Sequence, residues 1–198
     1  MIPTTQAAPR PVPARPDTIR MAVIGLGERS AWMLRLMADA EPGVRVEVIV
    51  DPHRAAARRR AVEADLPLAA APASFDDVDE FVEAAPAVDG VILGTRCLLH
   101  TPIAVKLAPL GIPLFIEKPV AISWAQLAQV RDAYPAERAD HVVVSFPLRR
   151  TPLFDAVVDI VRGGRPGGVN KHQAVHFGGS GTGFGDNLYR PYELWWGV

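Results

Sequence analysis

A strand, a glycine turn and a helix follow one another near the start of the chain, and this succession limits the available folds more than any other feature. The apolar segment Ile19–Ile24 predicts a short buried β-strand, and residues 31–37 predict a helix. Between them, Gly25 permits the dihedral angles of a tight turn, and Gly27 lets a pyrophosphate approach the backbone at the helix N-terminus. We therefore expect a dinucleotide to bind at this turn, whose other residues are Leu26, Glu28, Arg29 and Ser30.

A second apolar strand, Val44–Val50, ends in Asp51. An acidic residue at this distance from the glycine turn can accept hydrogen bonds from the ribose hydroxyls of a dinucleotide, and it would repel a 2′-phosphate. Arg54 follows three residues later and could bind a 2′-phosphate if Asp51 turned away. The predicted cofactor is thus NAD or NADP, with NAD favoured. Asp51 could also cap the helix expected over residues 52–65.

Three further strands, predicted over residues 90–94, 112–116 and 141–146, alternate with helices. One helix is expected to end near Gly111, and another to run from a capping box at Ser123 to about Ala133. Such alternation predicts an α/β fold with a Rossmann-type, doubly wound parallel sheet. Gly25, Asp51, Thr95 and Lys118 each follow the end of a predicted strand, so we expect them at the ligand-binding edge of this sheet.

Glu117-Lys118-Pro119 places an acid and a base where a buried strand reaches the surface. Pro119 restricts Lys118 to extended conformations and so positions its ammonium group. Read without its context, the same tripeptide is a strand exit with a surface ion pair. His100 lies in the loop after the third predicted strand, and it either lines the ligand cleft or caps its helix.

These motifs together resemble the Gfo/Idh/MocA oxidoreductases. The resemblance is carried by Gly25-Leu26-Gly27 with Asp51, by His100-Thr101-Pro102, and above all by Glu117-Lys118-Pro119. It implies hydride transfer between NAD(P) and the carbinol of a sugar or cyclitol. It also implies that Lys118 is the catalytic residue beside the nicotinamide, that its proline is cis, and that Glu117 orients Lys118 or binds ribose. We place the cofactor contacts at Gly25, Leu26, Gly27, Glu28, Arg29, Asp51, Arg54, Thr95, Arg96, His100, Glu117 and Lys118.

The chain departs from the family pattern in three ways. Ser30 replaces the third glycine, and Arg96 stands where the family usually has a proline. The family also continues well past Val198, so the chain resembles the N-terminal portion of such an enzyme, with a Rossmann domain over residues 19–147 and the start of an α+β substrate or oligomerisation domain over residues 148–198. The alternative is a dinucleotide-binding module without turnover, such as a sensor, a partner subunit or a remnant.

Composition argues against a nucleic-acid-binding, membrane or secreted protein. The formal net charge of −1 gives no overall field toward nucleic acid or anionic membranes. The single cysteine, Cys97, cannot form an intramolecular disulfide and suits a reducing compartment, and no segment has the pattern of a membrane span or signal peptide. We therefore expect a cytoplasmic protein, and a homo-oligomer is compatible with the sequence. Residues 1–18 are rich in proline and predict a disordered tail.

Overall fold

The computed structural model describes residues 17–146 and 151–163. The chain divides into two compact units, Met1–Pro147 and Leu148–Val198, which are treated separately. Residues 1–16 of the expected tail and most of the expected second domain lie outside the described residues.

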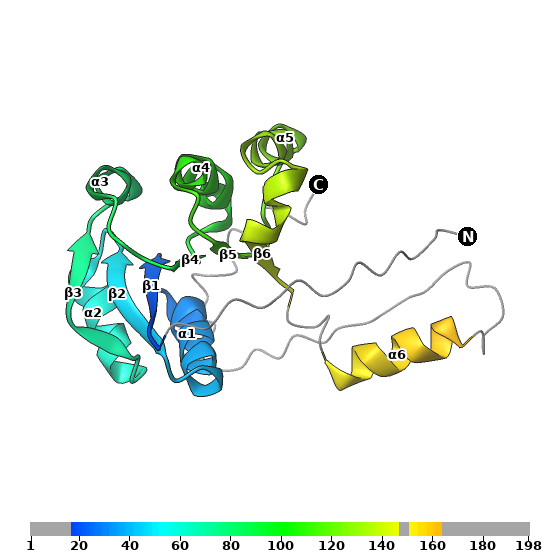
Figure 1. Cartoon of the computed structure of the whole chain (residues 1–198), viewed down its shortest axis with the longest axis horizontal. Helices are drawn as coiled ribbons and strands as arrows, with labels where there is room; N and C mark the ends of the chain where they lie inside the picture. Colours follow the sequence, from blue (N-terminus) through cyan, green and yellow to red (C-terminus); the bar gives the residue numbers. More distant parts are fainter. Residues whose placement is uncertain (1–16, 147–150, 164–198) are drawn as a thin grey trace, which may run out of the picture. The chain divides into compact units, whose positions relative to one another are not determined.

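The first unit contains a six-stranded sheet with the order β3-β2-β1-β4-β5-β6 (Figure 1). Every neighbouring pair of strands is parallel. The strands are β1 (Ile19–Ile24), β2 (Val44–Val50), β3 (Leu68–Phe75), β4 (Gly90–Leu93), β5 (Leu114–Glu117) and β6 (Val142–Ser145). The order reverses between β1 and β4, which is where a doubly wound sheet binds its ligand.

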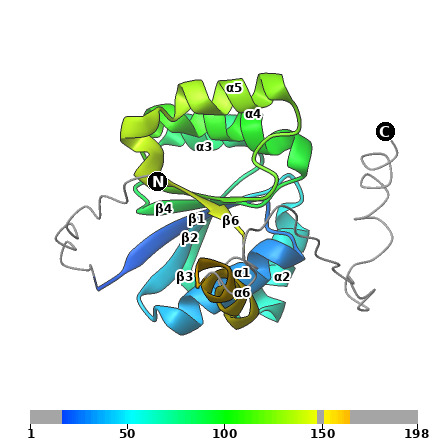
Figure 2. The ribbon, with the colours of Figure 1, turned by 90° about the vertical axis from the view of Figure 1, so that its right-hand side faces the viewer.

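Helices cover both faces of the sheet (Figures 1 and 2). The first face carries α1 (Glu28–Ala40) and α2 (Arg54–Glu63), and the second carries α3 (Val78–Ala84), α4 (Cys97–Leu107) and α5 (Trp124–Ala133). Two short 3₁₀ helices, Ala108–Leu110 and Ala136–His141, precede β5 and β6. The Rossmann-type α/β fold expected from the sequence is confirmed.

Successive strand residues supply two separate hydrophobic cores. In β4, Val91 and Leu93 pack in the core under α3, α4 and α5, whereas Ile92 packs in the core under α1 and α2. Because side chains alternate across a strand, a strand covered on both faces must be apolar throughout. All four residues of β4 are accordingly buried.

Strand β3 and helix α3 were not among the predicted elements. Strand β3 has the sequence Leu-Ala-Ala-Ala-Pro-Ala-Ser-Phe, which combines weak β-propensity with a proline at position 72. It lies at the edge of the sheet, where a residue without an N–H group is tolerated. Pairing with β2 therefore accounts for the extended conformation of β3 more than the composition of β3 does.

Asp89 and Arg20 form an ion pair at the amino ends of the central strands β1 and β4. The carboxylate of Asp89 accepts hydrogen bonds from Nε (3.0 Å) and Nη2 (2.7 Å) of Arg20 and from its backbone N–H (2.8 Å). These hydrogen bonds lower the pKa of Asp89 to about 2.

We predict that Asp89→Asn destabilises the protein at neutral pH, and that the difference from the wild type shrinks in acid. A lowered carboxyl pKa contributes stability above the unfolded-state value of about 4, and this contribution is lost as the pH falls toward about 2. Urea denaturation of both proteins between pH 7 and pH 2 measures this, and parallel stability curves would contradict the prediction.

The second unit contributes helix α6 (Pro152–Arg162), which Gly163 ends. Its N-terminus is capped by Thr151, whose hydroxyl oxygen accepts a hydrogen bond from the N–H of Phe154 (3.3 Å). The sequence also predicts a helix in this segment that ends at Gly163, as observed. Within the described ranges, no helix has both the length and the hydropathy needed to cross a bilayer.

Candidate functional site

The residues expected at the ligand edge come from four different strands. Gly25 directly follows β1, Asp51 follows β2 and Lys118 follows β5, while Thr95 stands two residues after the end of β4. Since these strands are parallel and neighbouring, their carboxyl ends lie along one edge of the sheet. The structure thus places the four residues along one edge of the sheet, as the sequence predicted.

The two glycines of the turn have different roles. Gly25 has φ +80°, and a Cβ atom there would lie 2.9 Å from the backbone nitrogen of Thr95, so no other residue fits. Gly27 is the N-cap residue of α1, and a Cβ atom built on it would meet nothing within 4 Å. Open space therefore faces the positive end of this helix, which suits the pyrophosphate of a dinucleotide.

Ser30 fills the position of the third glycine and lets α1 pack against the sheet. It is fully buried, and a Cβ atom on Gly94 would lie 2.0 Å from its Oγ. A serine here is compatible with the Rossmann packing only because residue 94 has no side chain. Among the described residues, Ser30 Oγ has no hydrogen-bond partner.

Asp51 holds the glycine turn and the start of α2 at the same time. One carboxylate oxygen accepts a hydrogen bond from the N–H of Leu26 (3.1 Å), and the other accepts one from the N–H of His53 (2.8 Å). The cap role considered for Asp51 is not taken, because the N-cap residue of α2 is His53 and no side chain caps this helix. Arg60 completes the arrangement, because its Nη1 donates to the carbonyl of Leu26 (2.8 Å). Nothing in the local sequence singled out Arg60.

Glu117 is buried at the end of β5 and pairs with a residue of α1. Its side chain is 8% exposed, and its Oε1 accepts a hydrogen bond from Nε of Arg29 (3.0 Å). The guanidinium group of Arg29 also lies over the ring of Trp32, 4.7 Å from the ring centre. The pair of Arg29 with Glu117 links the glycine-turn helix to the strand that precedes Lys118, a partnership that the sequence did not indicate for Glu117.

Lys118 has an exposed side chain on a fixed backbone. The Lys118–Pro119 peptide bond is cis, as the resemblance implied. Helix α4 holds the two carbonyls that follow: Nδ1 of His100 lies 2.8 Å from the oxygen of Pro119, and the hydroxyl of Thr101 donates to the oxygen of Val120 (2.9 Å). Two contacts from α4 thus hold the backbone directly after Lys118.

His100 takes neither of the two roles weighed for it. It lies inside α4, is 1% exposed, and its Nε2 stands 3.0 Å from the carbonyl oxygen of Thr95. With both ring nitrogens against backbone oxygens, the imidazole connects the Thr95 loop to the Pro119 loop. It supports the site from behind and does not line it.

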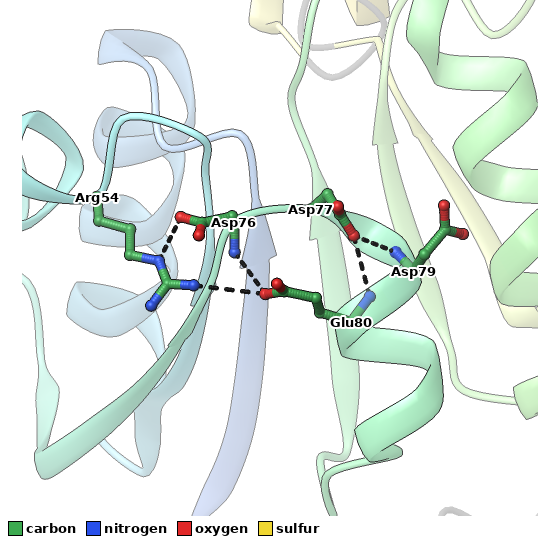
Figure 3. Close-up of polar contacts among 5 residues, drawn as sticks. All are labelled: Arg54, Asp76, Asp77, Asp79 and Glu80. Atoms are coloured by element: carbon green, nitrogen blue, oxygen red, sulfur yellow. Dashed lines mark hydrogen bonds and ion pairs between the residues drawn. The ribbon is translucent and has the colours of Figure 1, made fainter.

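The two remaining arginines behave differently from each other. Arg96 is exposed at the N-cap of α4 with φ −71°, which is close to the value a proline would impose, so the replacement preserves the backbone there. Arg54 forms ion pairs with Asp76, which follows β3, and with Glu80 of α3 (Figure 3). Its guanidinium group is therefore engaged on the side of α3.

Residues 19–146 match a protein-family model described as "Oxidoreductase family, NAD-binding Rossmann fold". Among curated proteins, the chain is similar to an inositol 2-dehydrogenase of Corynebacterium glutamicum, with 25% identity over 159 residues. That match covers 80% of this chain and 45% of the relative. The chain therefore spans less than half the length of this protein.

Solved structures show the same fold. The myo-inositol dehydrogenase of Lactobacillus casei, crystallised with NAD(H) and myo-inositol, has a TM-score of 0.64 at 18% identity and is matched over 74% of this chain and 42% of its own. The WlbA dehydrogenase of Bordetella pertussis, crystallised with NADH and UDP-GlcNAcA, has a TM-score of 0.63 at 21% identity, over 76% of this chain and 43% of its own.

Proposed function

Because the chain belongs to the oxidoreductase family with an NAD-binding Rossmann fold, we propose that it is the cofactor-binding part of a dehydrogenase acting on a carbinol of a sugar or cyclitol. The observation that carries this proposal is the convergence of the glycine turn, Asp51 and Lys118 at one edge of the sheet. The similarity to inositol 2-dehydrogenases supports the substrate class.

The residues present fit a dinucleotide. The open space at Gly27 would take the pyrophosphate, and Asp51 would accept hydrogen bonds from the adenosine ribose. Each carboxylate oxygen of Asp51 already accepts one backbone N–H and keeps capacity for a second donor. Asp51 favours NAD(H), because a 2′-phosphate would approach a carboxylate that two backbone groups hold in place.

Lys118 is the residue we propose for proton transfer. A nicotinamide cofactor, when bound, supplies the hydride acceptor or donor of the reaction. As the carbinol is oxidised, the neutral amine of Lys118 would accept the hydroxyl proton. As the carbonyl is reduced, the ammonium group of Lys118 would return a proton to the oxygen. The contacts of His100 and Thr101 with the two following carbonyls hold the lysine backbone in position for this role.

Isothermal calorimetry with NADH and NADPH tests the proposal. We expect the wild-type chain to bind NADH, and to bind NADPH more weakly. A folded chain that binds neither nucleotide at millimolar concentration would refute the cofactor assignment. Binding without turnover of any sugar or cyclitol alcohol, even in the longest natural form of the protein, would instead support a non-catalytic dinucleotide-binding module.

A further inference from the structure

An aspartate follows each of the neighbouring strands β2 and β3, where the adenosine ribose would bind under the proposed function. Val50 and Phe75 are paired residues of β2 and β3, and the backbone N–H of Asp51 donates to the carbonyl of Phe75 (3.1 Å). Asp51 and Asp76 are therefore the next residues along two neighbouring strands. A 2′-phosphate, with a charge of about −1.5 to −2, would have to enter beside both.

Arg54, the first residue of α2, is the first arginine after Asp51, and its guanidinium group already pairs with two carboxylates. Its Nε donates to the carboxylate of Asp76, and its Nη2 lies 3.4 Å from Oε2 of Glu80. Figure 3 shows the guanidinium group facing both carboxylates. To bind a phosphate, Arg54 would have to leave both partners.

The partners of Arg54 are themselves held in place. Oε2 of Glu80 accepts a hydrogen bond from the backbone N–H of Asp76 (3.0 Å). Asp77 caps α3, and its carboxylate accepts from the N–H groups of Asp79 (2.8 Å) and Glu80 (3.0 Å). The carboxylate of Glu80 and the backbone of Asp76 are thus held at the start of α3, and Arg54 is drawn toward that helix.

Asp51 cannot easily make room for a phosphate either, since both its oxygens accept backbone hydrogen bonds. The ion pairs of Arg54 are weaker restraints: the side chains of Arg54, Asp76 and Glu80 are 46%, 55% and 48% exposed. Exposed ion pairs contribute little each, so removing the two carboxylates should release the arginine without unfolding the protein.

We infer that Asp76 and Glu80 are specificity-determining residues, which hold Arg54 away from the 2′ position and so favour NAD(H) over NADP(H). This inference rests on the proposed function. This role differs from that of Asp51. Asp76 and Glu80 would act by keeping Arg54 from a 2′-phosphate, whereas Asp51 would act directly at the ribose.

The test compares NADH and NADPH affinities of the wild-type chain with those of Asp76→Asn/Glu80→Gln. The amides keep the size of the carboxylates and an acceptor oxygen but no longer hold a cation strongly. We expect the NADPH to NADH affinity ratio to rise roughly tenfold or more, because a freed arginine can make charge-assisted hydrogen bonds to phosphate. Adding Arg54→Gln to the double variant should remove this gain.

A matched control is Asp39→Asn/Asp65→Asn. Asp39 lies in the last turn of α1 and Asp65 lies two residues after α2, and both carboxylates pair with Arg35 (3.1 and 2.6 Å). We expect the affinity ratio of this control to equal that of the wild type. If the wild type binds NADH but the ratio is unchanged in Asp76→Asn/Glu80→Gln, or if the gain persists without Arg54, this inference alone is wrong. If the wild type binds neither nucleotide, the proposed function fails with it.

Discussion

Replacing Gly27 with valine is expected to lower NAD(H) affinity by roughly 100-fold or more while the chain stays folded, because the new side chain fills the space proposed for the pyrophosphate. Gly27 has φ −80° and ψ 177°, an extended conformation that valine adopts readily. The first atom of its side chain would contact no other group of the protein. The substitution therefore affects the ligand and leaves the packing intact.

Calorimetry with NADH, together with thermal unfolding, measures this prediction. Valine is a poorer N-cap than glycine, so a loss of about 1 kcal/mol in the free energy of unfolding is compatible with the prediction. Gly27→Ala provides a graded control, since one methyl group should weaken binding less than the valine side chain does. Wild-type affinity in a folded Gly27→Val chain would show that the dinucleotide does not cross this turn.

Gly25 shows why the two glycines must be distinguished. A side chain there would collide with the backbone of Thr95, 2.9 Å away, in a conformation with positive φ. Substitution of Gly25 would displace the loop after β4 whether or not a ligand is bound. Loss of binding in a Gly25 variant is therefore not evidence for a cofactor site, whereas loss in Gly27→Val is.

The sequence predicted those features that depend on local pattern. The alternation of apolar strands with helices predicted the parallel sheet. Ser123 predicted the start of α5, where its hydroxyl oxygen accepts a hydrogen bond from the N–H of Gln126 (3.2 Å). The ligand edge followed from parallel strands alone, since Gly25, Asp51 and Lys118 had to share one edge once the strands were parallel.

Contacts between distant residues could not be predicted in this way. Arg29 and Glu117 are 88 positions apart, and Arg60 and Leu26 are 34 apart. Each of these arginines resembles an ordinary charged residue on a surface helix until the fold brings its partner close. The same holds for the engagement of Arg54 by Asp76 and Glu80, because β3 and α3 were not predicted at all.

We expect Lys118→Ala to reduce dehydrogenase turnover of the longest natural form of the protein by a factor on the order of 10²–10⁴, the usual loss when a positioned general acid or base is removed. NAD affinity should change little, because Lys118 follows the strand end and contributes no part of the glycine turn. Steady-state kinetics with inositol and NAD, alongside calorimetry, separate the two effects. Lys106→Ala is a matched control, because Lys106 pairs with Asp79 and lies near the end of α4.

The 198-residue chain by itself is expected to bind cofactor and to turn over alcohols poorly or not at all. The match covers 45% of the length of the inositol 2-dehydrogenase to which the chain is similar. Under the proposed function, groups that orient the carbinol between Lys118 and the cofactor are expected in the remaining length, and lost orientation can cost more than a lost acid or base. Robust turnover by this chain alone would refute the expectation, and a longer Lys118→Ala protein that retains most of its activity would remove Lys118 from the chemistry.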